Sequence, residues 1–109
     1  GKMQKNAMVT IGIDVIQVLS KLKADICFMG VSSINTKLGL TEKGYEVSII
    51  KKAMMQSSDK VIALVSSEKL DTKMPYVVGE LNHLNTIITN LDPSDVKLEG
   101  YLNSGVIIL

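Results

Sequence analysis

The chain alternates between short apolar runs and segments in which apolar residues recur every three or four positions. The runs, rich in Val, Ile and Leu, predict strands, and the helical spacing predicts helices. Several runs lack polar alternation, which is typical of strands covered on both faces by helices. Strands are expected over residues 8–11, 25–31, 60–65, 76–78, 86–89 and 106–109, and helices over residues 13–22, 46–56 and 93–102.

This alternation predicts an α/β domain with a mostly parallel sheet and helices on both of its faces. In such sheets, ligands bind outside the carboxyl ends of the strands. Residues 30–41 and 66–71 follow two strands directly and carry polar groups. The first of these segments overlaps a long loop that is expected over residues 32–44, with sharp turns at Gly39 and Gly44. Both segments are therefore candidate ligand-binding loops.

The last predicted helix has recognisable boundary residues. Asp92 and Pro93 are expected to be its N-cap and its first helical residue. Gly105 is expected to end it in the left-handed conformation.

Composition narrows the class of protein. A length of 109 residues is enough for one hydrophobic core, so a single domain is expected. The formal net charge of +1 gives no indication of a nucleic-acid surface, and the apolar runs are shorter than the ~20 residues of a membrane span. Cys27, the single cysteine, lies in an apolar strand and is expected to be a buried thiol. A chain without a disulfide fits a reducing cytoplasm, so we expect a cytoplasmic protein without a membrane partner.

The sequence gives no pattern for a metal, a cofactor or a catalytic centre. His83 is the single histidine and has no Cys or His at ligand spacing, so it is expected at the surface. No glycine-rich dinucleotide motif or Walker lysine motif is present. Glu42 and Glu46 are expected to be solvated acids. No cofactor, no metal and no catalytic residue is therefore predicted.

Small and polar loop residues carry the remaining signal. Hydroxyl groups, backbone amides and the ammonium group of Lys69 would together suit a phosphorylated, hydroxyl-rich ligand. On composition alone, the alternative that these are ordinary loop residues is favoured. The loop residues concerned are Ser32, Ser33, Thr36, Gly39 and Thr41.

Five segments, in order, resemble the motifs of one protein family. They are residues 24–34 (ADICFMGVSSI), 39–41 (GLT), 51–55 (KKAMM), 61–69 (VIALVSSEK) and 86–90 (TIITN). The family is the DeoR-type bacterial transcription regulators, and the resemblance is to their C-terminal effector-sensing domain. It covers about residues 12–90.

The resemblance implies a Rossmann-like three-layer α/β fold with a mostly parallel sheet, related to ribose phosphate isomerase. It implies a repressor domain that binds a phosphorylated sugar or similar metabolite and typically forms a homo-oligomer. Residues 1–109 would be a single partial domain that lacks the family's N-terminal phosphate loop and winged helix-turn-helix. DNA would then be a partner only through that missing N-terminal domain.

Carried over position by position, the resemblance predicts a ligand site. The site would have a floor, a flanking loop, and a lysine that faces anionic or hydroxyl groups of the ligand. The residues are Gly30, Ser32 and Ser33 for the floor, Gly39 and Thr41 for the loop, and Lys69.

Other positions match the family less directly. Glu46 and Lys51 lie near its acidic and basic helix positions, with Val47 one residue away, and Ser66 stands where the family has an aspartate. Loss of that aspartate argues against isomerase chemistry. Two alternatives remain: an isomerase-like enzyme that uses Glu46, Glu68 or Asp71, and an α/β interaction domain without a ligand.

Overall fold

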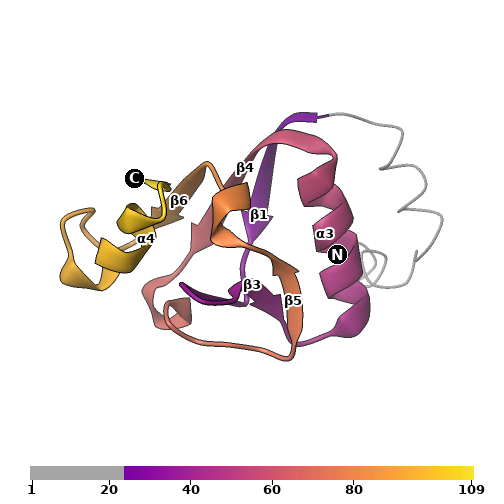
Figure 1. The fold of residues 1–109 in the computed structure, drawn as a ribbon, viewed down its shortest axis with the longest axis horizontal. Helices are drawn as coiled ribbons and strands as arrows, with labels where there is room; N and C mark the ends of the chain where they lie inside the picture. Colours follow the sequence, from indigo (N-terminus) through magenta and orange to yellow (C-terminus); the bar gives the residue numbers. More distant parts are fainter. Residues whose placement is uncertain (1–23) are drawn as a thin grey trace.

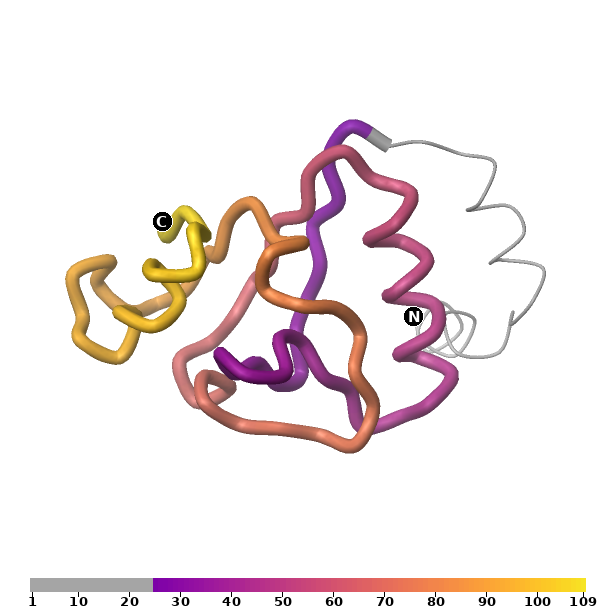
Figure 2. Tube along the Cα trace, viewed as in Figure 1, coloured from indigo at the N-terminus to yellow at the C-terminus, as the bar shows by residue number. Residues whose placement is uncertain are grey.

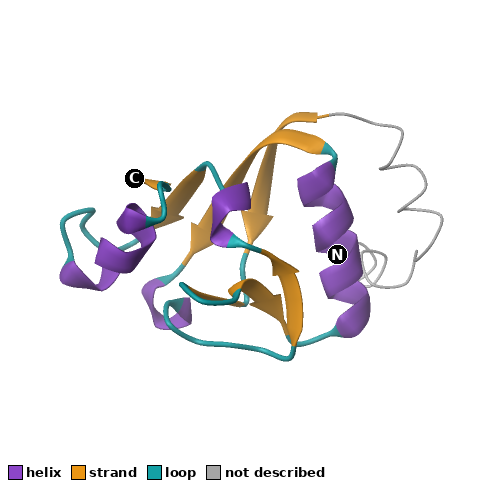
Figure 3. Ribbon diagram, viewed as in Figure 1, coloured by secondary structure: helices purple, strands orange, loops and turns teal. Residues whose placement is uncertain are grey.

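The computed structural model describes residues 24–109 (Figure 1). The strand predicted over residues 8–11 and the helix predicted over residues 13–22 lie outside this range. The described residues form a four-stranded sheet, a smaller three-stranded sheet and two α-helices, with 3-10 helices in the connections (Figure 3).

The four-stranded sheet is parallel throughout and has the order β1-β4-β6-β7. Its strands are β1 (Ala24–Gly30), β4 (Ser58–Val65), β6 (Thr86–Thr89) and β7 (Ile107–Ile108). They neighbour one another in chain order, and each was predicted from an apolar run. The α/β class with a mostly parallel sheet is thus confirmed, as is the buried thiol of Cys27 on β1.

Two α-helices and three 3-10 helices connect the strands. The predicted helix over residues 46–56 is confirmed as α3, and it precedes β4. The helices are α3 (Tyr45–Gln56), α4 (Glu99–Asn103), η1 (Ser67–Lys69), η2 (Leu81–His83) and η3 (Val96–Leu98). None of them is both long enough and apolar enough to cross a membrane.

The predicted loop over residues 32–44 is wrong, because most of it forms a hairpin. Strands β2 (Ser33–Asn35) and β3 (Gly39–Glu42) pair antiparallel, and β3 also pairs with β5 (Tyr76–Gly79). The side chain of Asn35 accepts hydrogen bonds from the backbone N–H groups of Lys37 and Leu38, at 3.0 and 2.7 Å. Gly39 follows at φ +79°, where a side chain would collide with the carbonyl oxygen of Gly79. This turn closes the hairpin.

The start of the last helix was also predicted wrongly. Asp92 accepts hydrogen bonds from the backbone and the hydroxyl of Ser94, which makes a local turn and not a helix cap. The N-cap lies three residues later, at Asp95, whose side chain accepts a hydrogen bond from the backbone N–H of Lys97 at the start of η3. Side-chain turns of the kind that Asp92 makes with Ser94 compete with helix formation, so the cap lies at the next aspartate, Asp95. Gly105, at φ +94°, ends the segment as expected.

The parallel sheet has one covered face and one exposed face, named here the inner and the outer face. Figures 1 and 2 show α3 towards the β1 side of the sheet and α4 towards the other end. One core joins the inner-face residues to the small sheet, α3, η2, η3 and α4. Its inner-face residues are Cys27, Met29, Val61, Ala63, Val65, Ile87 and Ile108.

Within residues 24–109, the helices that pack against the parallel sheet lie on its inner face. Side chains that alternate with the core residues point to the outer face, where Phe28 is 60% and Ile107 is 59% exposed. The physical reason is topological. Parallel crossovers are right-handed, and strands added in one direction place all their connections on one face.

Candidate functional site

The carboxyl ends of β1, β4 and β6 lie along one edge of the parallel sheet, as neighbouring parallel strands must. Gly30, the last residue of β1, pairs in register with Leu64 of β4. Beyond the sheet the two following loops stay together, because Ile34 and Leu70 form a parallel bridge. The two segments singled out in the sequence are therefore adjacent in space.

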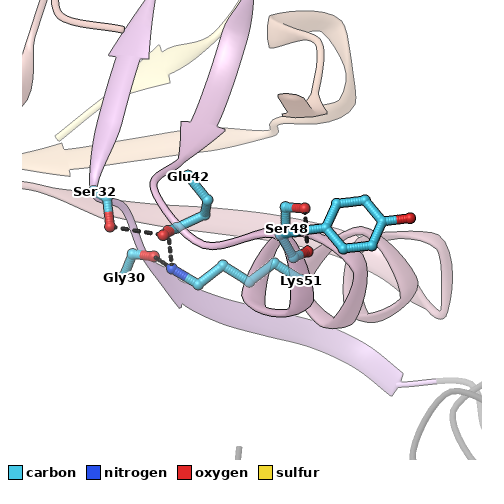
Figure 4. Close-up of polar contacts among 6 residues, drawn as sticks. Gly30, Ser32, Glu42, Ser48 and Lys51 are labelled. Atoms are coloured by element: carbon cyan, nitrogen blue, oxygen red, sulfur yellow. Dashed lines mark hydrogen bonds and ion pairs between the residues drawn. The ribbon is translucent and has the colours of Figure 1, made fainter. Parts of the chain in front are cut away.

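Lys51 of α3 is the centre of a polar cluster at this edge (Figure 4). Its Nζ donates to the carbonyl oxygen of Gly30 at 2.8 Å and to Glu42 Oε2 at 2.5 Å. The hydroxyl of Ser32 donates to Glu42 Oε1 at 2.9 Å. The side chain of Glu42 is 6% exposed and that of Lys51 is 19% exposed, so the ion pair is largely removed from water.

Local structure explains how α3 presents this lysine. The helix begins after Gly44, and its buried residues Ile50 and Met55 anchor it to the rest of the domain. The hydroxyl of Ser48 is buried within the first turn and donates to the carbonyl oxygen of Tyr45 (Figure 4). The helix face with Lys51 is therefore held towards the end of β1.

The cluster is electrically neutral but retains hydrogen-bonding capacity. One donor of the Lys51 ammonium has no partner among the contacts described, since the group has three donors. The hydroxyl oxygen of Ser32 can still accept. No atom lies within 4 Å of the position of a Cβ on Gly30, so the surface above this residue is open. Such a neutral set of donors and acceptors suits hydroxyl groups of a ligand better than a free anion.

Glu42 was expected to be a solvated loop acid, and that expectation is wrong. It lies on β3 and is the one charged residue within residues 24–109 that is buried. No sequence spacing could have paired it with Lys51, because the contact joins a hairpin strand to the second turn of a helix. Glu46, in contrast, is exposed in the first turn of α3.

Ser33 and Thr41 are near the cluster, but their hydroxyls are engaged within the fold. Both residues are almost fully buried. The Ser33 hydroxyl shares a hydrogen bond of 2.8 Å with the hydroxyl of Thr72. Thr41 Oγ1 accepts from the backbone N–H of Met74 at 2.8 Å. Both hydroxyls thus tie the hairpin to the segment that follows η1.

The loop after β4 contains Lys69 and is held by neutral hydrogen bonds. Asn90, at the end of β6, accepts from the backbone N–H of Ser67 at 2.8 Å and donates to its hydroxyl at 3.2 Å. The hydroxyl of Thr72 donates to the carbonyl oxygen of Lys69 at 2.7 Å. Within residues 24–109, Nζ of Lys69 has no ion-pair or hydrogen-bond partner.

Two exposed residues flank this lysine in the loop. A hydrogen bond from the side chain of Ser66 is the main reason that the pKa of Glu68 is lowered, and the charge of Lys69 contributes less. Glu68 is fully exposed and ionised at neutral pH. Ser66 therefore orients a neighbouring carboxylate, and its position at the carboxyl end of β4 leaves it accessible.

Tyr101 supports the same loop, and sequence reasoning missed it. Its hydroxyl donates to Asp71 Oδ1 at 2.9 Å and accepts from the backbone N–H of Asp71 at 3.0 Å. Asp71 has φ +60°, an uncommon conformation outside glycine. Burial of Tyr101 raises the pKa of its hydroxyl well above the usual value. The spacing of apolar residues that predicted this helix gives no indication that the hydroxyl of Tyr101 would bind Asp71.

A separate groove lies at the opposite end of β4 and contains none of the predicted site residues. Its volume is about 520 Å³. The groove is lined by Lys52, Met55, Gln56, Ser58, Asp59, Val61, Val77, Val78, Gly79, Glu80 and His83.

Among the described residues, no group of three or more His, Cys, Asp or Glu side chains could hold a metal ion.

The sequence profile of the family described as "DeoR C terminal sensor domain" matches residues 1–91. The chain belongs to this family. The match includes β1 to β6 and hence both loops of the carboxyl edge. The effector-sensing domain that the sequence motifs resembled is thus confirmed.

Two curated relatives agree with the family. The HTH-type transcriptional repressor GlcR of Bacillus subtilis (strain 168) is 31% identical over 109 residues, which are all of this chain and 42% of GlcR. An uncharacterized HTH-type transcriptional regulator of Haemophilus influenzae is 33% identical over 88 residues, 81% of this chain and 34% of that protein. The chain therefore spans about two fifths or less of the length of these relatives.

Proposed function

We propose that this DeoR-type sensor domain binds a phosphorylated sugar or a similar metabolite at the carboxyl edge of its parallel sheet. Binding would modulate DNA binding by a helix-turn-helix domain outside residues 1–109, in a cytoplasmic, homo-oligomeric repressor. The two relatives support this assignment, because both are named as HTH-type transcriptional regulators or repressors.

The observation that carries the proposal is the difference in charge between two adjacent groups. Lys51 is neutralised by Glu42, so together with Ser32 it offers hydrogen bonds without net charge. Lys69 is half-buried in the adjacent loop and has no counter-charge of this kind within residues 24–109. A ligand with hydroxyl groups at one end and a phosphate at the other matches this pair.

Some of the remaining predicted residues would line the site, and others would shape the structure around it. Gly30 leaves the floor open, and Ser66 adds a hydroxyl at the end of β4. The buried Ser33, Gly39 and Thr41 shape the hairpin that carries the cluster, and Glu46 lies at the exposed start of α3.

A binding role is favoured over isomerase chemistry by the state of the carboxylates. A general base works best with a pKa near the working pH. The pKa of Glu68 is lowered by its hydrogen bond from Ser66, and Glu42 is held in an ion pair by Lys51. Neither group is arranged to take a proton from a sugar phosphate.

A thermal-shift panel of phosphorylated sugars and their unphosphorylated counterparts tests the proposal. A ligand at one hundred times its Kd should stabilise the fold by about 2.7 kcal/mol. We expect a phosphorylated sugar to give the shift, Lys69→Ala to reduce it strongly, and Lys97→Ala, an exposed lysine on η3, to leave it unchanged.

Two results would count against this function. No shift with any phosphorylated sugar would leave the carboxyl-edge residues as structural loop residues. Turnover of a sugar phosphate that is lost in Glu68→Gln would favour the isomerase-like alternative.

A further inference from the structure

Tyr101 of α4 is fully buried, and its hydroxyl reaches both loops of the carboxyl edge. The hydroxyl donates to Asp71 Oδ1 at 2.9 Å and accepts from the backbone N–H of Asp71 at 3.0 Å. It also lies 3.3 Å from the carbonyl oxygen of Ile34. Asp71 belongs to the loop after β4, and Ile34 to the hairpin that follows β1. One side chain thus contacts both loops of the proposed ligand site.

Asp71 is the residue that this contact constrains most. Among the described residues it is the non-glycine residue with a positive φ, at +60°. Such a conformation is sparsely populated and persists only where the surrounding structure holds it. Tyr101 binds the backbone N–H and the side chain of Asp71, which are attached to opposite ends of its N–Cα bond. Holding both groups restrains rotation about φ.

The same backbone segment presents Lys69. Each backbone N–H of residues 69–72 donates a hydrogen bond, at 2.9 to 3.2 Å. Three of the four acceptors are backbone carbonyl oxygens, and the fourth is the hydroxyl of Tyr101. Thr72 is anchored to the hairpin through Ile34 and Ser33. A change of φ at Asp71 would therefore move Lys69 relative to the hairpin.

The place of Tyr101 is itself set by close packing of α4 on the hairpin turn (Figure 1). A Cβ on Gly100 would lie 2.9 Å from Cγ2 of Thr36, so glycine allows the helix to lie directly against the turn. Leu98, just before α4, is 0% exposed and anchors the helix in the core. All of these contacts lie within residues 24–109, and α4 lies beyond residues 1–91, which the family profile matches.

We propose that Tyr101 is a positioning residue for the ligand: through Asp71 it holds Lys69 at a fixed place relative to Ser32 and Lys51. This inference rests on the proposed function. A ligand that joins a phosphate to a hydroxyl-bearing sugar needs both sets of protein donors at a fixed separation. When the loop is already ordered, binding does not have to order it, and affinity is gained without a further contact.

Backbone order parameters from 15N relaxation of the whole chain test the effect on the loop without any ligand. We expect the order parameters of residues 69–72 to fall from about 0.85 towards 0.6 in Tyr101→Phe, and those of α3 to stay unchanged. Order parameters report motion within the folded state, so lower global stability alone does not change them. Tyr45→Phe, at a tyrosine that is 60% exposed, is the matched control and should change neither region.

NMR titrations with ribose 5-phosphate, ribose and inorganic phosphate test the effect on affinity. We expect Tyr101→Phe to weaken the binding of ribose 5-phosphate by about three- to tenfold. The weaker binding of ribose and of inorganic phosphate should be unchanged, because neither half of the ligand depends on the separation of the two loops. A structural defect of the whole domain would instead weaken the binding of all three probes.

Two further variants test whether the effect passes through Asp71 and Lys69. Asp71→Asn keeps a side-chain oxygen for the Tyr101 hydroxyl, and asparagine tolerates a positive φ. We therefore expect this variant to bind ribose 5-phosphate as the wild type does. In Lys69→Ala, adding Tyr101→Phe should cause no further loss, because the positioned charge has already been removed.

Four results would overturn the positioning role. They are unchanged order parameters of residues 69–72 in Tyr101→Phe, unchanged affinity of this variant for ribose 5-phosphate, an equal loss for all three probes, and the same loss in the Lys69→Ala background as in the wild type. A wild type that binds no sugar phosphate would overturn the proposed function and the affinity role with it. The order parameters would then still decide whether Tyr101 holds the loop, so the two failures are distinguishable.

Discussion

Two loops leave the carboxyl edge of the parallel sheet side by side, yet different forces hold them. The loop after β1 leads into the β2–β3 hairpin, where the ion pair between Glu42 and Lys51 fixes it to α3. The loop after β4 carries Lys69 and is fixed by hydrogen bonds with Asn90 and Tyr101, none of which involves the Lys69 ammonium. One lysine thus serves the structure and the other is left available.

The difference shows how a site can combine rigidity with a usable charge. A lysine that is paired with a buried carboxylate loses most of its attraction for an anionic ligand, although it can still donate a hydrogen bond. A lysine on a loop that is fixed by hydrogen bonds between other residues keeps its full charge. Each prediction below changes one of these supports and compares the two loops.

The largest effect is expected when the ion pair of the first loop is broken. Glu42→Gln would leave the ammonium of Lys51, which is 19% exposed, without its counter-charge. Loss of one partner of a buried charge pair costs up to about 3–5 kcal/mol, and for this partly exposed pair we expect a loss of about 2 kcal/mol. Urea unfolding measures the change.

Glu46→Gln is the matched control for this substitution. It removes an exposed carboxylate from the first turn of the same helix, and we expect a change below about 0.5 kcal/mol. Equal effects of the two substitutions would mean that the ion pair does not hold the first loop.

A smaller effect is expected when the hydrogen bonds of Tyr101 to the second loop are removed. Tyr101→Phe deletes the hydroxyl that binds both the carboxylate and the backbone N–H of Asp71. Two hydrogen bonds of this kind contribute about 1–2 kcal/mol in total. Urea unfolding at neutral pH measures this loss, and an unchanged stability would contradict the assigned support.

The same substitution has a signature in the pH dependence. Burial raises the pKa of Tyr101, so its stabilising contribution is complete below the ordinary tyrosine pKa of about 10. It is lost as the pH rises above that value, because the unfolded chain ionises first. Stability should therefore fall more steeply above pH ~10 in the wild type than in Tyr101→Phe.

The sequence predicted the parallel strands well because each is a compact apolar run. The runs at β1 and β4 were placed to within two residues of their observed ends. The same runs could not reveal that Phe28 lies in water and Met29 in the core. A strand without polar alternation has no pattern that distinguishes its two faces, so their difference emerges only from the order of the strands.

The sequence predicted which two loops meet at the carboxyl edge of the sheet, but not the contacts that hold them, and the ligand site there stays a prediction. The rule that ligands bind at the carboxyl ends of parallel strands selected the edge that holds Gly30 and Lys69. The hairpin was missed because strands of three and four residues are too short for a period to show. The partners Glu42 and Tyr101 come from separate elements, and only folding brings them to these loops.

The smallest stability effect, and the sharpest test of the comparison, comes from the two lysines themselves. Lys69→Ala removes a charge that has no ion-pair partner within residues 24–109, so we expect a change in unfolding free energy below about 0.5 kcal/mol. Lys51→Ala would leave the buried Glu42 unpaired and should cost clearly more, measured in the same urea titration. If the two substitutions lower the unfolding free energy equally, Lys69 also stabilises the fold. The hypothesis that its charge is available for a ligand then fails.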